Sequence, residues 1–78
     1  RKELYYSVGG SFKSRENAED YFKKMERKGF QPIHLGLQKG FYLVALDTFL
    51  TVNEAYTAAI SYSRRFPGMD VWVFHDGK

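Results

Sequence analysis

Cysteine is absent from this chain of 78 residues, which excludes disulfide bonds, thiolate nucleophiles and cysteine-ligated zinc. No apolar run approaches the roughly 18 residues of a transmembrane helix, and the opening RKELYYSVGG lacks the apolar core and cleavage site of a signal peptide. A chain of this length has room for only one small hydrophobic core. We therefore expect a single domain over residues 1–78, which contacts a membrane only through regions outside this chain.

A large excess of charge of one sign is also missing. The chain has 12 Lys and Arg residues against 9 Asp and Glu residues, and the basic residues are spread out rather than gathered in one block. The net charge of +3 fits weak attraction to polyanions without indicating a dedicated site. Aromatic residues, in contrast, make up 18% of the sequence, more than a core of this size can cover. Some aromatic rings are therefore expected on a surface of the folded domain.

The sequence repeats itself at an offset of 37 residues (49 − 12). The segment GSFKSRENAEDYF at 10–22 is echoed by DTFLTVNEAYTAA at 47–59, so that Phe12 aligns with Phe49 and Ser14 with Thr51. Both copies have apolar residues at i, i+3, i+4 and i+7, the spacing of one helix face. These positions are Ala18, Tyr21, Phe22 and Met25 in the first copy and Ala55, Ala58, Ala59 and Tyr62 in the second. The pattern predicts two pseudo-repeats, at about 4–37 and 41–75.

Short β-rich runs flank both expected helices. They are LYYSV before the first helix, FQPIHL after it, FYLVAL before the second helix and MDVWVF after it. Ser14 and Thr51 are suited to cap the helix N-termini, and Thr51 with Glu54 has the spacing of a capping box. Lys39 and Gly40 provide a turn between the middle strands. The order predicts an α+β fold, a β-α-β-β-α-β ferredoxin/RNP-like sandwich with a four-stranded antiparallel sheet and two helices on one face.

The pleat of the strands divides their side chains between the two faces of this sheet. On the third strand one parity comprises Phe41, Leu43 and Ala45, and the other comprises Tyr42, Val44 and Leu46. Because both helices cover the same face, the second face should be open, and either choice of parity leaves aromatic side chains on it. An open aromatic face is a candidate binding surface. Cover for a small core, or contact with another domain, is the alternative interpretation.

Catalytic and nucleic-acid-binding motifs are missing from this framework. His34 and His75 fall on the second and last strands, at opposite edges of a sheet of this topology, and no zinc-protease motif, phosphate loop or nucleophile elbow occurs. An RNA-recognition motif would carry RNP1 on the third strand, but KGFYLVAL matches only its first three positions. We therefore expect no enzymatic activity, no metal, no cofactor and no nucleic-acid partner.

Three segments that cover nearly the whole chain carry a family resemblance. They are YYSVGGSFKSRENAEDYFKKMERKGF, FYLVALDTFLTVNEA and DVWVF. Together they resemble the SPOR domain, the sporulation-related repeat module of bacterial cell-envelope proteins. The resemblance implies a non-catalytic periplasmic module, part of a longer anchored protein, that binds peptidoglycan. It also implies a preference for glycan strands stripped of their stem peptides at cell division sites.

The resemblance further implies that the open sheet face binds the glycan. Carried over by position, this face consists of Tyr6, Val8, Ser11, Phe41, Leu43 and Trp72. Rings such as Phe41 and Trp72 suit the apolar face of a sugar, and Ser11 suits a hydrogen bond to it. Where the family often has Gln and Arg, this chain has Val8 and Leu43, so two polar groups are lost. This departure keeps an alternative open, a protein-interaction or structural module that has lost glycan binding and meets another envelope or divisome protein.

Overall fold

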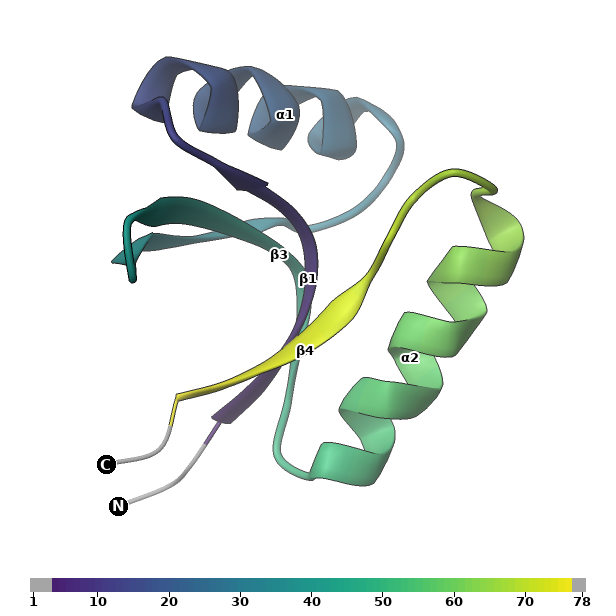
Figure 1. Ribbon diagram of the computed structural model, residues 1–78. Helices are drawn as coiled ribbons and strands as arrows, with labels where there is room; N and C mark the ends of the chain where they lie inside the picture. Colours follow the sequence, from purple (N-terminus) through teal and green to yellow (C-terminus); the bar gives the residue numbers. More distant parts are fainter. Residues whose placement is uncertain (1–3, 77–78) are drawn as a thin grey trace.

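The computed structural model describes residues 4–76, and its elements follow the order β-α-β-β-α-β (Figure 1). They are β1 (Leu4–Phe12), α1 (Arg15–Arg27), β2 (Ile33–Gln38), β3 (Phe41–Phe49), α2 (Val52–Arg65) and β4 (Trp72–Asp76). The strands form one antiparallel sheet in the order β2-β3-β1-β4. The predicted fold class is confirmed. No helix within residues 4–76 is long and apolar enough to cross a membrane.

Local sequence signals place the ends of both helices and the central turn. The Ser14 hydroxyl accepts a hydrogen bond from the Asn17 N–H at 3.3 Å, and the Thr51 hydroxyl accepts one from the Glu54 N–H at 3.2 Å. Between β2 and β3, Lys39 and Gly40 adopt positive φ angles of 52° and 90°. Two successive positive φ angles are typical of a tight turn that matches the twist of a hairpin. The predicted caps and turn are confirmed.

Both helices lie on the convex side of a strongly curved sheet (Figure 1). The buried residues of this side are Ala18 and Met25 of α1, Ala55 and Ala59 of α2, and Ser7, Val44 and Leu46 of the sheet. The remaining positions of the predicted helix stripes are half-buried. Small alanines at the contact allow the backbone of α2 to approach β1 closely, and the Ser7 hydroxyl donates to the Ala55 carbonyl at 2.9 Å.

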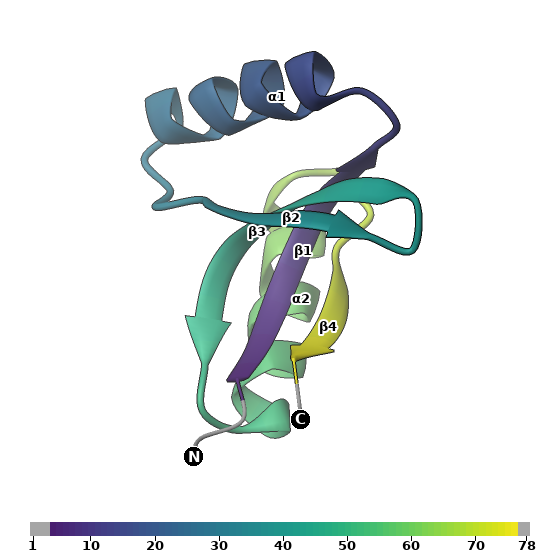
Figure 2. The same cartoon turned by 90° about the vertical axis from the view of Figure 1, so that its left-hand side faces the viewer.

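Irregular pairing bends the sheet in its middle. The register between β1 and β3 shifts twice between Ser7 and Gly10, and the register between β2 and β3 shifts between His34 and Gly36. Such bulges bend a strand and increase its twist. Figure 2 shows the result, with the β2–β3 hairpin crossing the long β1 strand at a steep angle. Consequently α1 covers one half of the convex side and α2 covers the other.

The curvature also fills the concave side of the sheet. Tyr6 and Val8 of β1 and Leu43 and Ala45 of β3 are buried there in one cluster. The half-buried side chains that surround it are Leu4, Ile33, Leu35 and Phe74. The sequence predicts an open face at this place, and the structure differs because neighbouring strands curl toward each other and cover the centre. We call these eight residues the concave cluster.

Candidate functional site

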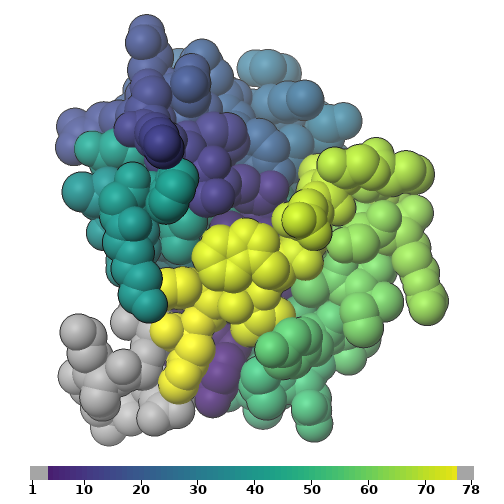
Figure 3. All heavy atoms as spheres, viewed as in Figure 1, coloured from purple at the N-terminus to yellow at the C-terminus, as the bar shows by residue number. Residues whose placement is uncertain are grey.

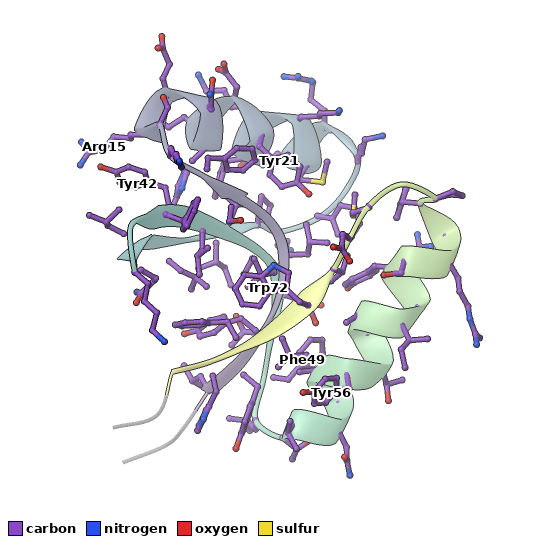
Figure 4. The ribbon with its side chains drawn as sticks, viewed as in Figure 1. Arg15, Tyr21, Tyr42, Phe49, Tyr56 and Trp72 are labelled. Carbon is purple, nitrogen blue, oxygen red and sulfur yellow. The ribbon has the colours of Figure 1, made fainter. Side chains whose placement is uncertain are left out.

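Three of the six residues assigned to a glycan-binding face are accessible to solvent. Phe41 is 39% exposed and Trp72 is 41% exposed, and Ser11 at the end of β1 is exposed as well. All three have the strand parity of the concave cluster and lie at its border, so we call them the concave rim. Figure 4 shows the Trp72 ring in the opening between β4 and the β2–β3 hairpin. The rim therefore offers two rings and one hydroxyl group to a ligand.

A row of aromatic rings supports Trp72 from below. Its ring packs edge-on against Phe74, with 6.4 Å between the ring centroids, and Phe74 in turn lies 6.3 Å from the buried Tyr6. Edge-to-face contacts of this kind orient rings as well as burying them. At the other side of the rim, the Lys13 ammonium lies 5.9 Å from the Phe41 ring centroid. The Trp72 side chain is thus held by its neighbours, and Phe41 has a cation beside it.

The other three assigned residues lie beneath this surface. The exposed fractions are 0% for Val8, 4% for Leu43 and 8% for Tyr6. In this conformation the side chains of Val8 and Leu43 are packed within the sheet and offer no area to a ligand. Their burial gives a physical reason for apolar residues at these two positions. A direct role of these three residues in binding stays a prediction.

A second concavity lies on the helix side, between the C-terminal halves of α1 and α2, where the sequence pattern gave no signal. This groove has a volume of about 660 Å³. Its floor is the Gly9–Ser11 segment of β1, one wall is α1, and the other wall is the 66–70 loop before Trp72. In Figure 3 these segments, purple, blue and yellow-green, meet on the visible face. We call this concavity the helix-side groove.

Basic side chains border the helix-side groove. Lys24 and Lys28 come from α1 and Arg65 comes from α2. The Lys28 ammonium and the Arg65 guanidinium lie 5.8 Å and 5.2 Å from the Phe66 ring centroid. Within residues 4–76, no carboxylate forms an ion pair with any of these three cations. The groove therefore carries positive charge that the described part of the chain does not neutralise by ion pairing.

Tyr21 also lines this groove, and its hydroxyl group is buried. Among the described residues the hydroxyl oxygen has no hydrogen-bond partner. Burial raises the pKa of Tyr21 above its ordinary value, because the charged phenolate would be poorly solvated. The ring packs 5.2 Å from that of Phe12. Tyr21 therefore contributes a half-buried ring to the groove, while its hydroxyl group is enclosed.

The two histidines lie at opposite edges of the sheet, as expected. The His34 ring on β2 stacks on Phe22 with a centroid distance of 4.3 Å, and the His75 ring on β4 stacks on Tyr5 at 4.4 Å. Across residues 4–76, no three His, Asp or Glu side chains are placed to hold a metal ion together.

Comparisons with known proteins connect this chain to one solved domain. No protein-family model matches the sequence, and no curated protein matches it. The structure is similar to the solution structure of the peptidoglycan binding domain of the B. subtilis cell wall lytic enzyme CwlC, with a TM-score of 0.70. The two chains are 27% identical, and the alignment covers 99% of this chain and 94% of that domain. The likeness thus includes every strand and helix described above.

Proposed function

We propose that this domain is a non-catalytic module that binds peptidoglycan. The observation that carries the proposal is its likeness to the peptidoglycan binding domain of CwlC, at 27% identity over nearly the whole of both chains. The pair of exposed rings at the concave rim agrees with it, because aromatic rings at a surface are suited to stacking on the apolar faces of sugars. Cell-wall association follows from this ligand.

The proposed contacts are those of the concave rim. Phe41 and Trp72 stack on sugar rings, and the Ser11 hydroxyl bonds a hydroxyl or acetamido group. Tyr6, Val8 and Leu43 act from below as part of the buried cluster, and Tyr6 packs against Phe74, which holds the Trp72 ring. Pre-positioned rings lower the entropy cost of binding.

The finer assignment is to the SPOR family. The quoted segments from Tyr5 to Phe30, from Phe41 to Ala55 and from Asp70 to Phe74 support it. On this assignment residues 1–78 form a single SPOR-like domain of a longer, anchored envelope protein in the periplasm. Its ligand is glycan freed of stem peptides, at sites of cell division.

Co-sedimentation of the purified domain with isolated sacculi tests the proposal. Sacculi treated with an amidase, which are rich in peptide-free glycan, are compared with untreated sacculi. We expect pelleting that rises with amidase treatment, and about tenfold or more loss of affinity in Phe41→Ala and in Trp72→Ala. Tyr56→Ala is the matched control, because Tyr56 is an exposed ring on α2, away from the rim. Full binding by both rim variants would contradict the proposed contacts.

A second candidate function is binding of an envelope or divisome protein. The apolar concave cluster does not favour it, because that cluster is internal. The observation in its favour is a row of exposed apolar side chains on α2, at Val52, Tyr56 and Ile60, one turn apart. Failure of the folded domain to pellet with either kind of sacculus would support this candidate over the first.

A further inference from the structure

The floor of the helix-side groove is an unpaired strand edge. β1 pairs with β4 from Leu4 to Val8, and the last pair is Val8 with Trp72. From Gly9 to Phe12, β1 has a strand neighbour only on the β3 side among the described strands. This edge is about 10 Å long, close to the length of a disaccharide. Backbone N–H and C=O groups at such an edge are available to a ligand that carries amide groups.

The charged residues that line the groove favour a ligand of one sign of charge. They are three cations, Lys24, Lys28 and Arg65, and one carboxylate, Asp70. Three cations against one anion, none of them in an ion pair among residues 4–76, favour a negatively charged group. The Phe66 ring at the same place adds an apolar surface. The groove thus combines amide recognition, positive charge and an aromatic ring.

The groove is continuous with the concave rim. Ser11 and Trp72 belong to the rim, and both also line the groove. A chain that stacks on Trp72 can therefore continue into the groove, where Gly9 and Gly10 also form part of the lining. This continuity favours a second part of the same polymer over an unrelated ligand.

Resting on the proposed function, we propose that the helix-side groove is a subsite for a carboxylate-bearing, N-acetylated sugar of the glycan strand. Alternate sugars of peptidoglycan carry a lactyl carboxyl group, which is bound as an amide where a stem peptide is attached and is a free carboxylate where the peptide has been removed. Lys24 of α1 and Arg65 at the C-terminal end of α2 meet this carboxylate. The acetamido group lies against the free edge at Gly9–Ser11.

The positions of the same basic side chains also have a structural explanation, and the experiment must distinguish it from ligand binding. Lys24 lies in the last turn of α1 and Arg65 in the last turn of α2, where cations stabilise the helix C-terminus. A double variant that removes both charges, Lys24→Gln with Arg65→Gln, is therefore compared with Lys23→Gln with Arg64→Gln. The control pair has adjacent positions and the same change of net charge, but neither of its residues lines the groove. Urea unfolding of both variants measures any loss of helix stability.

The ligand for the test is soluble glycan strands, purified free of phosphate polymers and stripped of stem peptides. A second sample has its carboxylates converted to methylamides. We expect the groove variant to bind the carboxylate form about threefold to tenfold more weakly than wild type, as for two exposed charge pairs. The control variant should bind it like wild type. Wild type should bind the methylamide form more weakly than the carboxylate form. The groove variant should bind the methylamide form with the same affinity as wild type does.

Several outcomes overturn the inference. Equal losses in the groove and control variants would show general attraction to positive charge. The ratio of wild-type affinity to groove-variant affinity is measured for both ligands. An equal ratio for the carboxylate form and the methylamide form would show that the cations do not meet the carboxylate. Tight binding of inorganic polyphosphate alone, lost in the groove variant, would show an anion site without sugar recognition. Loss in Trp72→Ala but not in the groove variant would leave the proposed function standing without this subsite, whereas no wild-type binding would overturn both.

Discussion

The Ser7 hydroxyl donates a hydrogen bond of 2.9 Å to the Ala55 carbonyl and joins β1 to α2 inside the core. Ser7 is fully buried, so its hydroxyl group needs this partner. We expect Ser7→Ala to lower the free energy of unfolding by about 1 to 2 kcal/mol, because a buried hydrogen bond is lost. Urea denaturation measures this. Ser11→Ala, at an exposed position of the same strand, should leave the stability unchanged, and equal losses in the two variants would contradict the assigned role.

Gly9 is required by the close approach of α1. A Cβ atom at this position would lie 2.6 Å from the Tyr21 hydroxyl and 2.9 Å from Leu46 Cγ. We expect Gly9→Ala to cost about 1 to 3 kcal/mol of stability, since neighbouring side chains must shift. Thermal unfolding checks the size of the effect.

Tyr21→Phe serves as the matched partner of that substitution. Because the Tyr21 hydroxyl is buried with no hydrogen-bond partner among the described residues, its removal alone should be neutral or slightly stabilising. In combination with Gly9→Ala it should recover part of the lost stability, since the nearest clash disappears. Additive effects of the two substitutions would argue that Leu46, not Tyr21, limits the space.

Val8→Gln should destabilise the domain rather than improve glycan binding. The Val8 side chain is fully buried in the concave cluster. A buried amide without hydrogen-bond partners costs about 1 to 3 kcal/mol. A urea denaturation curve shifted to lower concentration is the expected result. Wild-type stability together with tighter binding to sacculi would mean that the concave side opens to admit the ligand.

Tyr62 is expected to make the stability of the domain depend on pH in the alkaline range. Burial raises its pKa first, and the charge of Asp47 together with the hydrogen bond to its carboxylate, 3.2 Å long, raises it further. The folded pKa lies above the unfolded value of about 10, so the stabilisation is complete below that pH and is lost as the pH rises through the folded pKa. Unfolding midpoints measured from pH 8 to 11 should fall less steeply in Tyr62→Phe. A pH dependence in Tyr62→Phe as steep as that of wild type would contradict this role of Tyr62.

Much of the fold follows from local patterns in the chain. Ser14 and Thr51 predict the starts of the helices, and Lys39 with Gly40 predicts the hairpin, because these residues act on the backbone within a few positions. An offset of 37 residues carries β1 (Leu4–Phe12) onto β3 (Phe41–Phe49), so the element order could be predicted from the repeat. Parity along β3 places Leu43 and Ala45 together for the same reason, since strand side chains alternate.

The candidate sites depended on features that no local pattern contains. Phe41 and Trp72 are at the rim, while Val8 and Leu43 are covered, although all four share one sheet face. The helix-side groove brings together Gly9, Lys24 and Arg65, which lie far apart in the chain. By itself the sequence determined the elements, their order and the two faces of the strands, because these depend on neighbours along the backbone. Only the tertiary structure decided which residues of a face reach the surface, because the register shifts in β1 and β2 bend the sheet, and that curvature depends on how both helices and all four strands pack together.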